Sequence, residues 1–283
     1  MSESENGRMP PHEAGVGATD ALSLRVSVAT LARVQFEAPE DGRTMLALER
    51  TATLRGTGAH RNVNVVTKPF GGGVRLTDPD ALREAIGPFQ FDSERSRLEQ
   101  DFRLQIRPET WTRLEAMCRH QLTAGHAGIL DPSPLRELTE ELGDTLGIAA
   151  LPEPYRLRPL RTLIQGTPRK TESVRAPGRP TVRVYYVFEL VVEDEEIIGA
   201  MVEGSRTISD RDLADAAKRS ERGRANGVLV LGLQALREAW LGVPLRGRGD
   251  GLRLGEHRLA GNVPAVLDGI ELPGFRAHEV SPS

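Results

Sequence analysis

The first ordered segment of the chain is predicted from an alternation of apolar and polar side chains. The apolar members are Leu22, Leu24, Val26 and Val28, and the polar residues between them are Ser23, Arg25 and Ser27. A period of two is typical of a β-strand, which we expect over residues 22–36. Asp41-Gly42 favours a hairpin turn because it supplies residues that adopt positive φ angles, so residues 44–49 are expected to return as a second strand.

A third strand is expected over residues 62–68, and it leads into the turn Pro69-Phe70-Gly71-Gly72-Gly73. Consecutive glycines allow the backbone to approach a ligand closely or to adopt left-handed conformations. The same residues are also typical of a turn that is merely flexible. The sequence leaves both interpretations of this glycine turn open.

The rest of the chain is predicted to contain helices, one buried strand and irregular segments. We expect a helical insertion or lid at residues 78–127, in which the apolar stripe through Trp111, Leu114 and Met117 indicates core packing. Periodicity then predicts a helix at residues 135–146, a buried strand at 181–192 and an amphipathic helix at 228–240. Residues 1–20 are expected to be a disordered tail, residues 21–242 one domain, and residues 243–283 an irregular C-terminal extension.

The helix at residues 135–146 carries an acidic face. At 3.6 residues per turn, this face presents Glu137, Glu140, Glu141 and Asp144, opposite a stripe of leucines. Most acidic runs of this kind are solvated helix faces. Here no lysine or arginine stands four residues after Glu137, Glu140 or Glu141, so no ion pair with a cation at that later position relieves the repulsion. A Mg²⁺ or Mn²⁺ ion would relieve it, because these cations prefer oxygen ligands and are shared between carboxylates and phosphates.

The acidic face carries a family resemblance. The residues Arg136-Glu137-Leu138-Thr139-Glu140-Glu141-Leu142-Gly143 resemble the second half of the Nudix box, which reads Arg-Glu-aliphatic-any-Glu-Glu-any-Gly. The hairpin and the glycine turn before them are similar to the features that precede the box in that family. The resemblance implies an α+β fold, namely a Nudix-like α/β/α sandwich with a mixed β-sheet and, here, a helical insertion.

The chain departs from the family pattern at several positions. Leu122 and Gly128 stand where the first half of the box has a glycine and a glutamate, and Asp144 replaces an aliphatic residue. In addition, 62 residues separate Gly73 from Arg136, which is more than is usual in the family.

The resemblance also implies an activity, the metal-dependent hydrolysis of a nucleoside-diphosphate-linked pyrophosphate with Mg²⁺ or Mn²⁺ as cofactor. Glu140 and Glu141 would bind the metal, Glu137 would bind the metal or act as general base, and Arg136 would orient these acids. Glu189 or Glu203 would supply a further ligand, although surface positions on a strand and a loop explain these two acids more simply. Two alternatives stay open: a catalytically inactive nucleotide-binding sensor or regulatory protein, favoured by Gly128, and an interaction module with a solvated acidic helix.

Residues 155–183 form the most basic stretch of the chain. The candidate substrate-binding residues are Arg156, Arg158, Arg161, Arg169 and Lys170, together with Gly72 and Gly73 of the glycine turn. Guanidinium groups match the geometry of phosphate, and the prolines of this stretch indicate a loop after residues 157–164 that becomes ordered when a phosphate binds. A solvated linker is the alternative, because 34 of the 37 basic residues of the whole chain are arginine.

Net charge and cysteine content indicate which partners and which cellular location to expect. The formal net charge of −3 argues against nucleic acid as a partner. The single cysteine, Cys118, cannot form an intrachain disulfide and indicates a cytoplasmic protein, and its spacing from His120 and His126 does not follow a zinc pattern. The N-terminus lacks the features of a secretory signal, and no apolar stretch is long enough to predict a membrane span. The oligomeric state stays open, a homodimer included.

Overall fold

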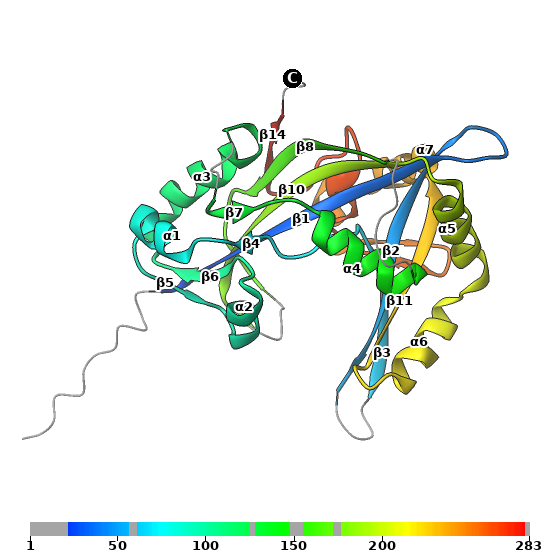
Figure 1. Cartoon of the computed structure of the whole chain (residues 1–283), viewed down its shortest axis with the longest axis horizontal. Helices are drawn as coiled ribbons and strands as arrows, with labels where there is room; N and C mark the ends of the chain where they lie inside the picture. Colours follow the sequence, from blue (N-terminus) through cyan, green and yellow to red (C-terminus); the bar gives the residue numbers. More distant parts are fainter. Residues whose placement is uncertain (1–21, 57–60, 125–127, 148–154, 172–176, 281–283) are drawn as a thin grey trace, which may run out of the picture.

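The computed structural model describes residues 22–56, 61–124, 128–147, 155–171 and 177–280 (Figure 1). The tail expected at residues 1–20 lies outside these ranges. Within them the chain forms a long, curved, mixed β-sheet with helices packed against it (Figure 1). The coarse prediction of an α+β fold is therefore confirmed. Across the same ranges, no helix combines the length and the apolar character that crossing a membrane requires.

The sheet is organised around β1 (Leu24–Glu37), and its strand order is β12-β13-β3-β2-β1-β10-β8-β14. The other strands on this path are β2 (Thr44–Arg55), β3 (Asn62–Lys68), β8 (Tyr155–Gln165), β10 (Pro180–Val192), β12 (Leu252–Leu254), β13 (His257–Leu259) and β14 (Phe275–Glu279). β1 pairs antiparallel with β2 and parallel with β10, which makes the sheet mixed. The strands predicted at residues 22–36, 44–49, 62–68 and 181–192 correspond to β1, β2, β3 and β10.

One predicted helix is wrong over its first half. Residues 228–240 were expected to be helical, but β11 (Arg224–Gly232) pairs with β2, and α7 (Leu233–Leu241) begins only after Gly232. A short apolar run fits a buried strand as well as a helix, so periodicity alone does not separate the two. Pairing with β2 along the whole of β11 provides partners for the backbone groups that face β2, and this decides for the strand.

The insertion predicted at residues 78–127 contains strands as well as helices. Its elements are α1 (Pro79–Ile86), β5 (Phe89–Phe91), α2 (Glu94–Glu99), β6 (Arg103–Ile106), the 3₁₀ helix η2 (Pro108–Thr110) and α3 (Trp111–Ala124). β6 pairs with β1, so this segment extends the sheet at the beginning of β1. On either side of it, β4 (Arg75–Leu76) and β7 (Leu130–Asp131) form a separate pair.

The remaining helices and the C-terminal segment complete the fold. They are α4 (Leu135–Leu146), α5 (Glu195–Thr207), α6 (Asp210–Arg219), η3 (Leu245–Asp250) and η4 (Val263–Val266), with the two-residue strand β9 (Arg169–Lys170) beside β10. The helix predicted at residues 135–146 is confirmed as α4. The extension predicted to be irregular contributes β12, β13 and β14 to the sheet, and Val263 and Val266 are fully buried, so it is part of the packed structure.

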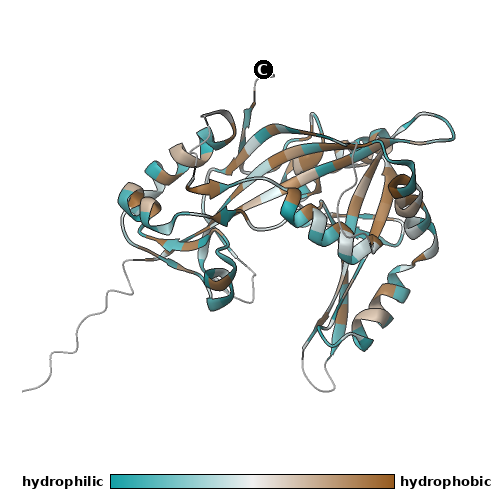
Figure 2. Ribbon diagram, viewed as in Figure 1, coloured by the Kyte–Doolittle hydropathy of each residue, from teal (hydrophilic) through white to brown (hydrophobic). Residues whose placement is uncertain are grey.

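Both faces of the central sheet are buried. On one face, Val34 and Phe36 of β1 pack with Leu138 and Leu142 of α4. On the other face, Leu31 lies in a cluster with residues of α7 and η4. Figure 2 shows apolar residues concentrated along the strands, where these layers meet. Helix α4 is thereby held against the sheet by one apolar stripe, which fixes the position of its acidic side chains.

Candidate functional site

Helix α4 places the acidic residues of the predicted box. Pro134 precedes its first residue, and Gly147, with a φ of 73°, ends it. Leu138 and Leu142 are fully buried against the sheet. Glu141, which lies next to them on the helix surface, is also buried. Because Glu137 and Glu140 lie farther around the helix, the three glutamates occupy different environments: Glu140 is mainly exposed and Glu137 mainly buried.

The glycine turn lies beside the middle of β1. The amide of Thr30 donates to the carbonyl of Gly72 at 2.9 Å, and the amide of Ala32 donates to the carbonyl of Phe70 at 2.8 Å. Gly71 has a φ of 138°, and a Cβ at this position would overlap with the carbonyl oxygen of Thr30. A residue with a side chain therefore cannot replace Gly71 without a shift of the backbone.

Carboxylate groups lie against the other two glycines of the turn, in the space that a side chain would occupy. A Cβ on Gly72 would overlap with the carboxylate of Glu137, and a Cβ on Gly73 would lie 2.5 Å from Asp101 Oδ1. The glycines therefore permit close approach by side chains of the chain itself, and approach to a ligand stays a prediction. The approaching groups belong to α4 and to the segment before β6, so folding closes the 62-residue gap between the glycine turn and the box.

Glu141 is the acid that joins α4 to the glycine turn. Its carboxylate accepts a hydrogen bond of 2.6 Å from the amide of Gly71 and one of 3.3 Å from Lys68 Nζ. Lys68 also forms an ion pair with Glu49, which is fully buried in β2. Glu49 in turn accepts from Thr51 Oγ1 at 2.8 Å and pairs with Arg224 at 3.0 Å. The Lys68 ammonium group therefore lies between two buried carboxylates.

Burial and charge act against each other in this group. Burial raises the pKa of Glu141 well above its ordinary value, although Lys68 opposes the shift. Burial works against the charge of Lys68, but attraction to Glu49 and Glu141 is stronger and raises the pKa of its ammonium group. Lys68 therefore stays charged at neutral pH and is the cation of this part of the site.

Arg136 holds the second acidic group. It forms an ion pair with Glu137, contacts Glu140 at 3.5 Å and donates to the carbonyl of Gly73 at 3.3 Å. Asp101 stands nearby and pairs with Arg103 at 3.0 Å. Burial raises the pKa of Glu137, which Arg136 opposes, and burial likewise raises the pKa of Asp101. Arg136 thereby contacts two of the glutamates that the resemblance implies it would orient, and this role stays a prediction.

The glycine turn, Lys68 and the charged side chains of α4 line a cavity of about 540 Å³, which we call the α4 cavity. Its cationic side chains are Lys68, Arg95, Arg103, Arg136 and Arg224, and its acidic ones are Glu99, Asp101, Glu137, Glu140 and Glu141. Gly71, Gly72 and Gly73 form part of its wall. A volume of this size accommodates a ligand as large as a nucleotide.

The acidic side chains of the α4 cavity are chemically suited to bind a metal ion. Their oxygens are the donors that Mg²⁺ and Mn²⁺ prefer. Over the ranges that the structure describes, however, no three Asp, Glu, His or Cys side chains gather closely enough to hold an ion. Glu141 faces Lys68 and Gly71, Glu137 faces Gly72 and Arg136, and Glu140 is at the rim. Glu137, Glu140 and Glu141 thus face different partners in the structure, and their role as metal ligands stays a prediction.

The basic residues predicted to bind substrate lie elsewhere. Arg156 and Arg158 line a different cavity of about 610 Å³, where Arg158 pairs with Glu189 and Arg156 contacts Glu193 at 2.9 Å. Arg161 donates to two carbonyl groups of the C-terminal segment and anchors that segment to β8. None of these three residues, and neither Arg169 nor Lys170 on β9, lines the α4 cavity. Of the predicted substrate-binding residues, the structure brings only Gly72 and Gly73 to the box.

The two further acids proposed as metal ligands also lie away from the cavity. Glu189 accepts from Arg33 and Arg158, and Glu203 is an exposed residue of α5. Sequence reasoning missed several residues of the α4 cavity, chiefly Lys68, and it also missed Glu49, the buried partner of Lys68 behind the cavity wall. One signal was present: Glu49 follows the apolar residues 45–48, and a charged residue in a buried strand needs a partner.

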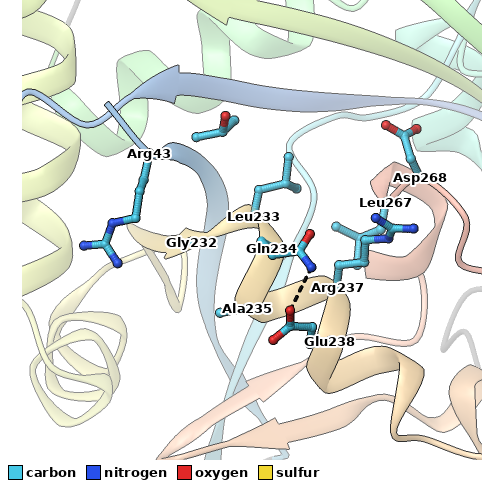
Figure 3. Close-up of a pocket in the computed structure, with 10 residues that line it drawn as sticks. Arg43, Gly232, Leu233, Gln234, Ala235, Arg237, Glu238, Leu267 and Asp268 are labelled. Carbon is cyan, nitrogen blue, oxygen red and sulfur yellow. Dashed lines mark hydrogen bonds between the residues drawn. The ribbon is translucent and has the colours of Figure 1, made fainter. Parts of the chain in front are cut away.

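A third cavity, of about 490 Å³, opens at the start of α7 (Figure 3). Arg43 and Arg237 line it together with apolar residues, and Gln234 Nε2 donates to Glu238 at 2.7 Å within α7 (Figure 3). It contains no residue that the sequence predicts for the site.

Comparisons with protein-family models, with curated proteins and with solved structures find no match for this chain. Its function is therefore inferred from the geometry of the α4 cavity.

Proposed function

We propose that the chain is a Nudix-like protein that recognises a nucleoside diphosphate or a derivative of one in the α4 cavity and does not turn it over. One observation carries this proposal: the glycine turn and the box helix, far apart in the sequence, meet through the contact between Gly71 and Glu141. They do so at the wall of a cavity of suitable volume. The layers on both faces of the mixed sheet support the α/β/α sandwich that the proposal includes.

Recognition of phosphate is supported by the cations of the cavity. Arg95, Arg136 and Arg224 have side chains that are between 38% and 64% exposed, so they reach the open part of the cavity. Exposed ion pairs contribute only about 0–1 kcal/mol, so a phosphate can replace Glu99 or Glu140 as the partner of an arginine at small cost. Guanidinium groups bind phosphate through two parallel hydrogen bonds, which also orients the ligand.

Absence of turnover is supported by the partners of the acids. Glu141 is held by Lys68 and Gly71, and Glu137 is held by Arg136, so these carboxylates are engaged inside the protein. Gly128, which stands where the box has its first glutamate, has a φ of 101° in the turn before β7 and brings no carboxylate to α4. The single cysteine supports a cytoplasmic location, which is part of the proposal.

Metal-dependent hydrolysis with Mg²⁺ or Mn²⁺ is the second candidate. It is favoured by the cluster of carboxyl groups around Glu137. Burial raises the pKa of Glu137, and so does repulsion from Glu140 and Asp101. A divalent ion would relieve this repulsion, provided that Glu137 and Glu140 leave Arg136 and converge. The two candidates make opposite predictions for product formation.

The test is a calorimetric titration of the full chain with ADP and with sugar-linked nucleoside diphosphates, together with an assay for released phosphate or nucleotide in Mg²⁺ and in Mn²⁺. We expect binding without product. Arg136→Ala should weaken binding by about tenfold or more, since a hydrogen bond to a charged group contributes about 1.5–3 kcal/mol. Arg156→Ala, in the other cavity, is the matched control and should bind as the wild type does. Product formation that Glu140→Gln and Glu141→Gln together abolish would establish the hydrolase instead, and no binding of any ligand would refute both.

A further inference from the structure

The Lys68 ammonium group holds a position that the chemistry of its neighbours would otherwise assign to a metal ion. It pairs with the fully buried carboxylate of Glu49 and lies 3.3 Å from Glu141 Oε1. Both side chains contact the same ammonium group, so Glu49 and Glu141 are neighbours. The fully buried carboxylate of Glu49 needs a cation beside it, because an unpaired buried charge is strongly unfavourable, and Lys68 supplies that cation while it also contacts Glu141.

Lys68 also faces the ligand space. Its side chain is 29% exposed and lines the α4 cavity, whereas the Glu49 side chain is 0% exposed. An ammonium group has three N–H donors, and contacts to Glu49 and Glu141 account for two of them. The remaining donor can point into the cavity, toward an anionic group of a ligand.

From this geometry we infer that Lys68 is the built-in cation of the α4 cavity: it excludes a divalent metal ion from the Glu49–Glu141 pair and contacts ligand phosphate directly. Ligand recognition is then independent of Mg²⁺ and Mn²⁺. The inference deepens the proposed function and rests on it for the identity of the ligand. The exclusion of metal rests on Glu49, Lys68 and Glu141 alone.

The exclusion is tested by Mn²⁺ titrations of the full chain, followed by electron paramagnetic resonance, without any nucleotide. Lys68→Ala removes the ammonium group and leaves both carboxylates, so Mn²⁺ should bind this variant roughly 100-fold more tightly than the wild type, or more, because a unit charge at this distance is worth several kcal/mol. Lys218→Ala is the matched control, since Lys218 is an exposed residue of α6 that pairs with Asp215. Adding Glu141→Gln to Lys68→Ala should abolish the gain.

Two outcomes would overturn the inference. One is the absence of any gain in Lys68→Ala over Lys218→Ala. The other is tight Mn²⁺ binding by the wild type that Glu141→Gln removes. If Lys68→Ala is unfolded without metal, Mn²⁺ is expected to restore its folding transition, because an ion that binds only the native state stabilises it by mass action. Failure to restore the transition would also overturn the inference.

The direct contact with phosphate is tested separately with ADP as the probe. Wild-type affinity should be the same in Mg²⁺ and in excess chelator, and loss of binding in chelator would show that a metal carries the contact. Absence of binding of ADP and of the sugar-linked nucleoside diphosphates in both conditions would refute the proposed function but leave the Mn²⁺ titrations unaffected. The two failures are therefore distinguishable.

Discussion

Gly71→Ala is expected to cost much more stability than an alanine substitution at an open glycine. The added Cβ would overlap with the carbonyl oxygen of Thr30 and lie 3.0 Å from the Cα of Leu31, and both are backbone atoms of the central strand. A rotamer change cannot relieve such a contact. The φ of 138° is rare for residues with a side chain and costs about 1–3 kcal/mol, while overpacking costs a further 1–3 kcal/mol or so. We therefore expect a loss of about 2–6 kcal/mol in the free energy of unfolding.

Two other glycines provide the matched comparison. Gly42 has a φ of 66° and open space around it, so Gly42→Ala should cost only about 1–2 kcal/mol. At Gly72 the Cβ would overlap with a side chain, that of Glu137, which can rotate away, so Gly72→Ala should change ligand affinity more than stability. The assay is urea unfolding followed by the fluorescence of Trp111 and Trp240, with midpoints compared at constant m value. A Gly71→Ala midpoint equal to that of Gly42→Ala would refute the packing of the glycine turn on β1.

Three further predictions concern packing and buried ionisable groups. Burial opposes the charge of Asp92, but hydrogen bonds from Ser96 and Arg25 outweigh it and lower the pKa of its carboxyl group. At neutral pH the free energy of unfolding of the wild type should therefore exceed that of Asp92→Asn by about 3 kcal/mol. This difference should persist above the ordinary Asp pKa and disappear as the pH falls through the lowered pKa of the folded state. Urea unfolding at a series of pH values measures the difference, and a difference that grows on acidification would contradict the assignment. Leu142→Ala, at a fully buried position of α4, should cost about 2–5 kcal/mol in the same urea assay, and Glu140→Ala less than about 0.5 kcal/mol; equal costs would contradict the packing of α4. Burial raises the pKa of the Cys118 thiol to about 12, so a thiol reagent should modify it only after unfolding, and rapid reaction of the native protein would show that α3 opens.

The sequence predicts elements well where a local pattern has a clear start and end. Helix α4 has the predicted bounds because a leucine stripe runs from a proline-containing start to Gly147, which adopts a left-handed conformation. The strands β3 and β10 lie where alternation and apolar runs place them. In β11 the apolar run was compatible with both states, and pairing with β2, a contact distant in the sequence, decided between them.

The candidate site was only half predictable, because its residues meet through the sheet. The acidic residues of α4 and the glycine turn were found from their local chemistry, but their meeting depends on the backbone contacts of the turn with β1. The arginines of β8 had equally suitable chemistry, yet β8 lies beyond β10 in the strand order, and its Arg156 and Arg158 line another cavity. Residue type indicates which chemistry is available, whereas strand order decides which side chains share a cavity.

Position 68 carries a lysine in a chain whose basic residues are nearly all arginine. Arginine fills 34 of the 37 basic positions, so a single arginine carries little information, but a lysine departs from that bias. Lys170 and Lys218 are exposed, and Lys68 lies between the carboxylates of Glu49 and Glu141. A compact ammonium group fits between two adjacent carboxylates, whereas a planar guanidinium is larger and binds them side by side. The same compactness and point charge make lysine the side chain that most closely takes the place of a metal ion, so composition and geometry support the same role for Lys68.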